Sequence, residues 1–303
     1  MEVNKLLLID GNAVLHRAYY AMPDWRNRSG EATAGVYGFL SMLLNAIEKL
    51  APTHLVVVFD TPEPTFRHVM YVGYQSGREK ERQVSEDIWG QVEKLKLVFE
   101  KMNVPVFTVA GFEADDVIGT LGVQASVTDE FEVVIITGDR DLMQLVNDKV
   151  SLYMPRKGLS DTELVDKGNV VERMGVNPDQ IIDYKALVGD SSDNYPGVPG
   201  IGPKTAIDLI RSYASFSNIY NNLEKIKESV KLKLADGYEA GKLSEQLATI
   251  RTDVPVTLKT DECVLPASQK ITEVLQELGY KSLIKRIGGK VSDKDDNQTT
   301  LFE

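Results

Sequence analysis

The sequence predicts an α/β protein, with a parallel sheet covered by helices on both faces and a second, helical domain after it. The first observation is a set of short, continuous apolar runs, which are typical of strands buried on both faces. The second is the helical periodicity of the stretches between those runs. The third is a change in composition after about residue 175, where short helical segments and a Gly/Pro-dense stretch replace the apolar runs.

The four apolar runs and the helical stretches between them define the first domain. The strands are predicted at residues 6–9, 54–59, 104–109 and 133–136. Helical spacing of apolar residues follows the first two strands, over 36–47 and 88–102, and a further helix begins near residue 113, directly after the third strand. This alternation is typical of a parallel sheet built from strand–helix–strand units.

The domain boundaries follow from these patterns. We assign residues 1–174 to the sheet domain and 175–260 to the helical domain. A C-terminal segment over 261–288 contains a predicted helix at about 268–278. The polar and charged residues 289–303 are expected to form a disordered tail.

The composition excludes several classes of protein. With 43% hydrophobic and 26% charged residues, the chain has the composition of a soluble globular protein. Its formal net charge of −11 argues against a simple electrostatic nucleic-acid binder. The single Cys263 excludes an intramolecular disulfide and a Cys-rich zinc site. We find no signal peptide and no apolar run of membrane length, and therefore expect a cytoplasmic protein with no membrane partner.

Acidic residues follow all four predicted strands, at the edge where open α/β sheets bind ligands. Any one of them could be an ordinary turn or helix-capping residue. Four strand ends that carry carboxylates to one edge instead indicate a common site. In strand order, these acids are Asp10; Asp60; Glu113, Asp115 and Asp116; and Asp139.

Three more acids extend this group. Asp141 follows Asp139 by two residues, and Asp190 and Asp193 lie three apart at the start of the Gly/Pro-dense stretch, where an Asp-rich capping loop is the alternative. Hard divalent cations prefer oxygen ligands, and Mg²⁺ takes only one or two carboxylates directly. The whole group therefore indicates two metal ions with a water-mediated outer shell, as used for in-line displacement at phosphodiesters.

Two further segments have the residues to contact phosphates. The polar segment between the second strand and the helix at 88–102 is either an ordinary solvated surface or a mobile arch over the acids. In the Gly/Pro-dense stretch 197–205, glycines let the backbone approach a ligand, and the helix that starts at Pro203 offers free N–H groups to a phosphate. The basic residues of these segments are Arg67, Arg78, Lys80, Arg82 and Lys204.

Over nearly its whole length the sequence resembles the 5′ nuclease family that includes the N-terminal domain of bacterial DNA polymerase I, within the flap endonuclease/5′–3′ exonuclease superfamily. This resemblance implies a PIN-like (resolvase-like) α/β core, a helical arch at about 67–102 and a helix–three-turn–helix DNA-binding domain. The motifs that carry it are Leu8-Ile-Asp10-Gly-Asn-Ala-Val-Leu-His-Arg17, Val36-Tyr-Gly-Phe39, Val58-Phe-Asp60, Thr65-Phe-Arg67-His68, Glu113-Ala-Asp-Asp-Val117, Thr137-Gly-Asp-Arg-Asp-Leu142 and Gly189-Asp-Ser-Ser-Asp-Asn194 through Ala206.

The resemblance also implies roles for individual residues. Arg67 and Arg78, with Lys80 as a further cation, are expected at the phosphate near the scissile bond. Tyr74 is placed like a residue that stacks on an unpaired base. The 197–204 hairpin is expected to grip duplex DNA and to bind a K⁺ ion. The full DNA-contacting set is Tyr74, Gln75, Arg82, Gly200, Gly202, Lys204 and Thr205, and the set for two Mg²⁺ or Mn²⁺ ions is Asp10, Asp60, Glu113, Asp115, Asp116, Asp139, Asp141, Asp190 and Asp193.

Two positions depart from the family pattern. Gln75 stands where the family commonly has Lys, and Val69 stands where an acid often follows the Arg-His pair. The main hypothesis is a metal-dependent nuclease that acts on 5′ flaps, nicks and 5′ ends of DNA in Okazaki primer removal and repair. The alternatives are a branched-DNA binding module with weakened or no catalysis, motivated by Gln75, and a phospho-acceptor signalling domain that uses Asp10 and Asp60.

The resemblance carries expectations about partners as well. It implies branched or nicked double-stranded DNA with a 5′ single-stranded flap as the substrate, and a functional link to a DNA polymerase and a ligase. We expect a monomer. The chain stops where the nuclease region of the family ends, so we interpret it either as a stand-alone 5′ nuclease or as a piece of a longer protein.

Overall fold

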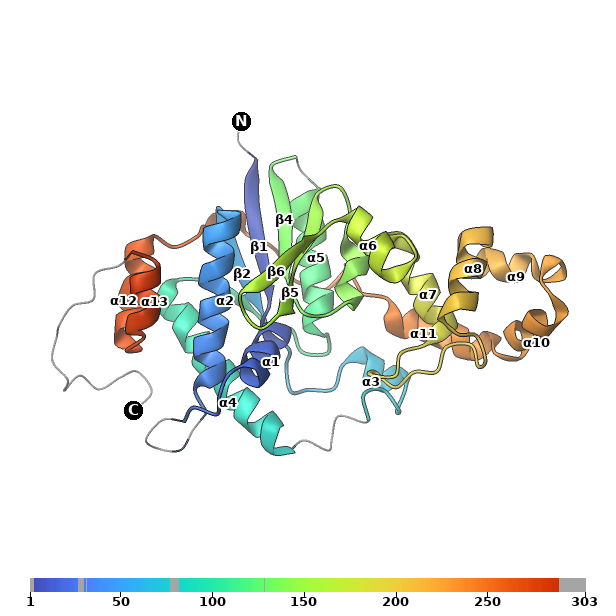
Figure 1. The fold of residues 1–303 in the computed structure, drawn as a ribbon, viewed down its shortest axis with the longest axis horizontal. Coiled ribbons are helices and arrows are strands. Elements are labelled where there is room, and N and C mark those ends of the chain that lie inside the picture. The colour runs from blue at the N-terminus through green and yellow to red at the C-terminus, as the bar shows by residue number, and fades with distance from the viewer. Residues whose placement is uncertain (1–2, 27–29, 31, 77–81, 128, 289–303) are drawn as a thin grey trace.

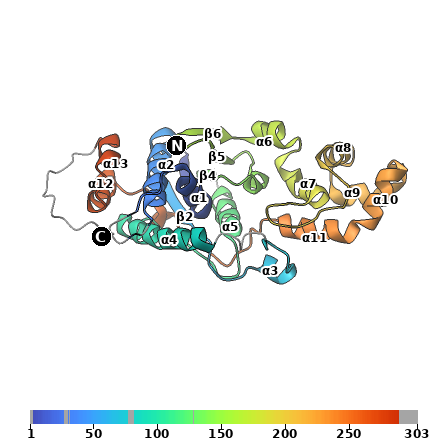
Figure 2. The same cartoon turned by 60° about the horizontal axis from the view of Figure 1, so that its bottom comes forward.

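The computed structural model describes residues 3–26, 30, 32–76, 82–127 and 129–288 (Figure 1). The molecule is elongated, as two views of the ribbon show (Figures 1 and 2). A six-stranded sheet lies near the middle, a helical arm of α8, α9 and α10 forms one end, and α12 and α13 lie at the other.

The sheet has the strand order β3-β2-β1-β4-β5-β6, with β1 at its centre. The first five strands are parallel, and β6 pairs antiparallel with β5. Because β1 pairs on both sides and is covered on both faces, its residues Leu6 to Ile9 are all buried and apolar. The strands are β1 (Asn4–Asp10), β2 (His54–Val58), β3 (Val106–Phe107), β4 (Phe131–Ile136), β5 (Val150–Lys157) and β6 (Asp161–Val165).

The predicted α/β class is confirmed, and the sheet that was predicted as parallel carries one antiparallel strand at its edge. The strands β5 and β6 were not predicted, because β5 mixes apolar with polar residues and contains Pro155, and β6 is partly exposed. Such edge strands lack the continuous apolar run of a strand covered on both faces. The third predicted strand, 104–109, is also much shorter in the structure, at Val106–Phe107.

Helices cover both faces of the sheet, as predicted. Leu7 and Ile9 of β1 face one hydrophobic cluster, and Leu6 and Leu8 face the other, because successive side chains of a strand point to opposite sides. Residues of α5 and α6 belong to the cluster of Leu6 and Leu8. The helices that supply the cluster of Leu7 and Ile9 are α1 (Gly11–Ala21), α2 (Ala34–Leu50), α4 (Arg82–Met102), α12 (Ser268–Glu277) and α13 (Lys281–Arg286), while the opposite face has α5 (Ala114–Ser126) and α6 (Lys167–Met174).

The hydrophobic cluster on the α5 face continues without a break into the helical arm. It runs from β1 and α5 to Val198, Leu209 and Phe216. The sheet part and the base of the arm are therefore held together by one core rather than by a flexible linker. The remaining helices are α3 (Phe66–Met70), α7 (Ile181–Val188), α8 (Pro203–Tyr213), α9 (Phe216–Asn221), α10 (Glu228–Asp236) and α11 (Tyr238–Ala248), with 3₁₀ helices η2 (Asp141–Leu145), η3 (Pro178–Gln180), η4 (Leu223–Lys225) and η5 (Thr260–Cys263).

After α11 the chain returns along α5. Val254 N–H donates to Thr120 Oγ1 at 3.1 Å, and the side chain of Gln124 bonds the backbone of Val256 and Leu258. No strand forms at 254–256 in the described chain; side chains of a helix hold this polar segment instead. The expected tail at 289–303 lies outside the described residues. Within the described parts of the chain, no helix combines the length and apolarity that a bilayer span requires.

Candidate functional site

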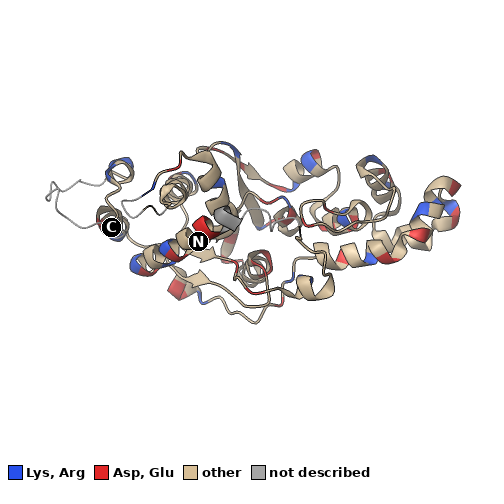
Figure 3. Cartoon of the chain, turned by 90° about the horizontal axis from the view of Figure 1, so that it is seen from below, with Lys and Arg blue, Asp and Glu red and all other residues tan. Residues whose placement is uncertain are grey.

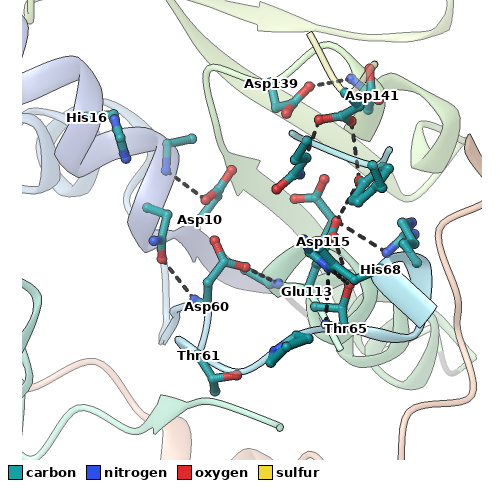
Figure 4. A pocket seen from close by; sticks show the side chains of 18 of the residues that line it. Asp10, His16, Asp60, Thr61, Thr65, His68, Glu113, Asp115, Asp139 and Asp141 are labelled. Carbon is teal, nitrogen blue, oxygen red and sulfur yellow. Dashed lines mark hydrogen bonds and ion pairs between the residues drawn. The ribbon is translucent and has the colours of Figure 1, made fainter. Parts of the chain in front are cut away.

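The predicted acids gather at the carboxyl edge of the sheet. They surround a cavity of about 970 Å³, where the labelled carboxylates lie around one space (Figure 4). The ends of β1, β2 and β4, the first turn of α5 and the loop before α8 each supply at least one of them. Seven of the nine predicted acids line the cavity, namely Asp10, Asp60, Glu113, Asp115, Asp139, Asp141 and Asp193, and the exposed Glu63 lines it as well.

Asp10, the last residue of β1, is held by two hydrogen bonds. Its Oδ1 accepts from Ala13 N–H at 2.9 Å and so caps α1, while its Oδ2 accepts from Thr137 Oγ1 at 2.7 Å. The Thr137 hydroxyl oxygen in turn accepts from Asp139 N–H at 2.9 Å. Since Thr137 follows β4, this one side chain fixes the acids at the ends of two neighbouring strands relative to each other.

Asp60 follows β2 and is fixed in a similar way. Its backbone N–H donates to Asn12 Oδ1 at 2.9 Å, and its Oδ1 accepts from Ala114 N–H at 2.7 Å. Ala114 is the first residue of α5, so the Asp60 carboxylate lies at the positive end of that helix. The strand end and the acidic helix turn are thereby locked together.

Burial and mutual repulsion raise the pKa of several of these acids. Burial raises the pKa of Asp10 to about 7, against the bonds from Ala13 and Thr137, and the nearby Asp60 raises it further. Burial also raises the pKa of Glu113 to about 7, although the Arg67 guanidinium opposes this shift. Burial and then the charge of Asp139 raise the pKa of Asp115. Carboxylates that repel one another in this way fit a divalent cation, which neutralises the charge and prefers oxygen ligands.

A second acid group lies at the side of the cavity towards the helical arm. One oxygen each from Asp141, Asp190 and Asp193 can come within 4.8 Å of the others, a spacing that suits a cation. Lys185 of α7 is ion-paired with Asp141 and, at 2.6 Å, with Asp190. Although burial opposes it, hydrogen bonds from Lys185 and then Ser192 hold the pKa of Asp190 at about 2.

The loop that carries Asp190 and Asp193 depends on a close backbone approach. Asp190 and Tyr195 form a backbone bridge with N–H···O distances of 2.9 and 3.0 Å. Gly189 and Gly197 lie across this bridge from each other, both with positive φ. A Cβ on Gly197 would lie 2.2 Å from Gly189 N, so only glycine fits there.

The prediction that Asp116 belongs to the metal set is not supported by its contacts. Asp116 is fully buried and does not line the cavity. Its oxygens accept two bonds from Arg67, at 2.7 and 2.9 Å, and further bonds from the N–H groups of Glu113 and Arg251. The carboxylate is therefore taken up by these donors and serves to hold the start of α5.

Arg67, which is expected to bind a DNA phosphate, is held in the structure by contacts within the protein, and its role at a phosphate stays a prediction. It is only 3% exposed, and besides Asp116 its guanidinium donates to Leu247 O and Thr249 O, each at 2.8 Å. These bonds join α3, α5 and the end of α11. In this arrangement Arg67 acts as a clamp between the sheet part and the arm, and it also lines the cavity beside Glu113, with Nη1 at 3.3 Å from Glu113 Oε2.

Tyr74 and Gln75 lie at the base of the predicted arch, in contact with the acids. Tyr74 is buried, and its hydroxyl donates to Glu113 at 3.2 Å and to Asp193 at 3.3 Å, so in this arrangement its ring is not available to stack on a base. Gln75 Nε2 donates to Asp193 Oδ1 at 3.1 Å. Asn194 adds a bond to Gly73 O at 2.8 Å. These contacts tie the arch base to the loop that bears Asp193.

The remaining predicted DNA contacts divide into two groups. Arg78 and Lys80 lie outside the described residues, and the side chain of Arg82, which starts α4, does as well. On the arm, Gly202 precedes α8, and Lys204 in its first turn is exposed. Gly200 lies in the loop before them, and Thr205 follows Lys204 within α8; these positions stay predictions.

Sequence reasoning missed three residues that organise the site, namely Asn12, Thr137 and Lys185. Asn12 lies two residues after Asp10 in the sequence, and Thr137 lies two residues before Asp139. These positions were the signal that could have identified them. Lys185 lies five residues before Asp190 on α7, and no pattern in the sequence indicates that it points towards Asp141. Tertiary contacts alone reveal its place.

Comparison with known protein families agrees with this geometry. Residues 5–175 match the family model described as the 5′–3′ exonuclease N-terminal resolvase-like domain. Residues 176–271 match the one described as the 5′–3′ exonuclease C-terminal SAM fold. The chain belongs to the 5′–3′ exonuclease family. The family resemblance and the fold predicted from the sequence are thereby confirmed.

Sequence relatives of this 5′–3′ exonuclease family member are longer proteins, and the chain matches only a part of each. The chain is 38% identical over 294 residues to DNA polymerase I of Bacillus caldotenax, and 35% identical over 301 residues to DNA polymerase I of Bacillus subtilis. These matches cover 96% and 98% of the chain but only 33% and 34% of the polymerases. The chain thus spans about a third of the length of these relatives.

Solved structures of nucleases share the fold. The 5′-exonuclease of bacteriophage T5 aligns with a TM-score of 0.66 at 22% identity, covering 94% of this chain and 97% of that one. The catalytic core of Rad2 aligns with a TM-score of 0.57 at 16% identity, covering 94% and 87%. At this level of identity the likeness shows that this chain shares the fold of those nucleases, and it does not show what substrate this chain acts on.

The raised pKa values predict that a divalent cation stabilises the protein more at high pH. The metal-free folded protein binds more protons than the unfolded chain between about pH 4 and pH 7, so its free energy of unfolding falls as the pH rises across that window. Cation binding requires deprotonated carboxylates. We expect Mn²⁺ to raise Tm more at pH 8 than at pH 6, and Asp10→Asn to lose most of that rise. An equal rise at both pH values would contradict this account.

The clamp predicts a large stability loss for Arg67→Met. This change leaves Asp116 buried without its cation, which costs about 3–5 kcal/mol in comparable buried pairs. Urea denaturation measures the free energy of unfolding. Arg251→Met is the matched control, since its guanidinium pairs with Asp253 at the surface and we expect a loss of about 1 kcal/mol or less. A loss for Arg67→Met no larger than that of the control would show that the clamp is not needed for stability.

Proposed function

We propose that the chain is a metal-dependent, structure-specific 5′ nuclease that hydrolyses phosphodiester bonds at 5′ flaps, nicks and 5′ ends of DNA. The observation that carries this proposal is the cavity in which seven of the predicted carboxylates meet at the carboxyl edge of the sheet, beside an arm with a glycine-rich hairpin. Solved structures with the same fold support it. The T5 enzyme is described with zinc and, as a flap endonuclease, with DNA and metal ions, and Rad2 is described with a DNA substrate.

The two acid groups would each hold one divalent cation, Mg²⁺ or Mn²⁺. When bound, such ions activate a water molecule and stabilise the attacking and leaving oxygens of an in-line displacement. The chain's own part is to hold the ligands in place before any ion arrives, through Thr137 for Asp10 and Asp139 and through Ala114 N–H for Asp60. We assign one ion to Asp10, Asp60, Glu113, Asp115 and Asp139, and the other to Asp141, Asp190 and Asp193.

The arm would hold the duplex part of the substrate. The exposed N-terminus of α8, with Lys204 in its first turn, offers free N–H groups and a positive charge to a phosphate. Lys and Arg are interleaved with acids along the helices of this end (Figure 3), so DNA binding would depend on local contacts rather than on net charge. Lys233 Nζ donates to Gly200 O at 3.0 Å, so a K⁺ ion at the hairpin would have to share this carbonyl oxygen with Lys233 or displace the lysine from it.

The arch base would guide the single-stranded flap to the cavity. Tyr74 and Gln75 line the cavity and could meet the strand that enters it. We propose that Arg78 and Lys80 neutralise the phosphate near the cut, while Arg67 contributes only by clamping α3 to α5 and α11. Arg82, at the start of α4, would contact the flap backbone.

The wider role follows from the relatives. Because the matched proteins are DNA polymerases I, we propose a function in Okazaki primer removal and DNA repair, in sequence with a polymerase that fills the gap and a ligase that seals the nick. We further propose that the protein acts as a monomer in the cytoplasm.

A 5′-labelled flap duplex tests the proposed activity directly. We expect cleavage with Mg²⁺, none with EDTA, and a loss of at least about a hundredfold for Asp139→Asn, because this change removes a negative ligand at the assigned cation site. Asp148→Asn is the matched control, since Asp148 lies at the surface and pairs with Lys167. Equal product with Mg²⁺, with EDTA and with Asp139→Asn would overturn the two-metal mechanism.

Gln75 favours one alternative, a branched-DNA binding module with little catalysis. A neutral side chain contacts Asp193 where a cation would both pair with that acid and stabilise a phosphate. We therefore expect Gln75→Lys to raise single-turnover flap cleavage by about tenfold, and Gln75→Glu to lower it. No gain would indicate that Arg78 or Lys80 already supplies the charge. Flap binding without any cleavage at saturating Mg²⁺ would favour the binding module.

A further inference from the structure

The positively charged side chain of Lys185 lies inside the second acid group, which consists of Asp141, Asp190 and Asp193. Its side chain is 7% exposed, and its ammonium group contacts both Asp141 and Asp190. These two acids come from different parts of the chain, since Asp141 follows β4 and Asp190 follows α7. The lysine therefore bridges the sheet part and the arm at the point where the second cation would bind.

The negative charges of the second acid group explain why a lysine is needed among them. Asp141, Asp190 and Asp193 present three carboxylates whose nearest oxygens lie within 4.8 Å of one another. Without a positive charge among them, their repulsion would push the loop after α7 away from β4. Lys185 reduces the charge of the group from −3 to −2, which is the charge that one divalent cation balances.

The Tyr195 hydroxyl is a second observation at this place. It is buried and has no hydrogen-bond partner among the residues that the structure describes. The backbone of Tyr195 pairs with that of Asp190. Burial raises the pKa of the Tyr195 hydroxyl, and the charges of Lys185 and Asp141 also act on it, so the hydroxyl lies close to the same group. A buried hydroxyl is rarely left without a partner, so an additional ligand or its water belongs beside Asp190 and Lys185.

We propose that Lys185 is a positioning residue that keeps the Asp141–Asp190–Asp193 group assembled without metal and, by occupying two of its carboxylates, weakens the binding of the second divalent cation. This inference rests on the proposed two-cation function and deepens it. Lys185 holds the ligands ready, but it repels an incoming cation and competes for the same oxygens. The cation at Asp10, Asp60 and their neighbours would then bind first, and the second group would fill only at higher concentrations.

The proposal predicts tighter metal binding when the lysine is removed. In Lys185→Gln the three acids lose their internal cation, so the weaker of two classes of bound Mn²⁺ should gain affinity. Repulsion between a unit charge and a divalent cation a few ångströms apart corresponds to roughly tenfold in affinity even in water. A lysine with a merely structural role would give the opposite result, since its loss would weaken every site.

The whole chain is titrated with Mn²⁺, and the electron paramagnetic resonance signal reports the concentration of the free ion. This titration measures the dissociation constants of both classes of Mn²⁺ site. We expect the weaker dissociation constant to fall about tenfold in Lys185→Gln and to return to a weak value when Asp190→Asn is added. Lys149→Gln is the matched control. Lys149 Nζ lies 2.6 Å from Asp129 Oδ1, and this ion pair does not line the cavity. Unchanged or weaker binding in Lys185→Gln would overturn the inference.

Two further outcomes separate this inference from the proposed function. If the wild-type chain binds Mn²⁺ no more tightly than Asp10→Asn does, the two-cation function itself fails. If Lys185→Gln does not fold, Lys185→Arg decides the point, because it keeps the charge. The dissociation constant of the weaker Mn²⁺ site in Lys185→Arg should then stay within about threefold of the wild-type value. A clear gain in affinity would overturn the proposal.

Discussion

Repulsion among carboxylates is the constraint on which the rest of this molecule depends. Eight acids line one cavity, and burial raises the pKa of Asp10 and Glu113 to about 7. A fold can keep such a group only if other contacts hold each acid in place. The hydroxyl of Thr137, the first N–H of α5 and the ammonium of Lys185 do this from three different elements. The acids of the proposed cation site are thus held in place by bonds that exist without cations.

The same constraint explains how the two parts of the chain are joined. The acids near β1 and β2 belong to the sheet, and Asp190 and Asp193 belong to the loop before α8, so the site is complete only when the arm is held against the sheet. One continuous hydrophobic core does part of this. Two buried polar links add to it, the Arg67–Asp116 clamp and the pairing of Lys185 with acids from both parts.

These links also divide the predicted site into residues that meet the cavity and residues that support it. Asp116 and Arg67 were predicted to face metal and DNA, but each satisfies the other in a buried pair. Tyr74 likewise directs its hydroxyl to Glu113 and Asp193. Motif membership alone did not separate these roles, because acids three residues apart on a helix turn can point to the cavity or to the core.

The sequence by itself determined the sheet class, the edge at which the acids meet and the family to which the chain belongs. Continuous apolar runs mark strands covered on both faces, and the ends of parallel strands lie at one edge whatever the details of packing. The tertiary structure alone decided that β6 runs antiparallel, that Asp116 is turned towards Arg67 and that Lys185 lies among the second group of acids. These facts depend on contacts between residues far apart in the chain, such as Lys185 with Asp141, and such contacts leave no periodic pattern in the sequence.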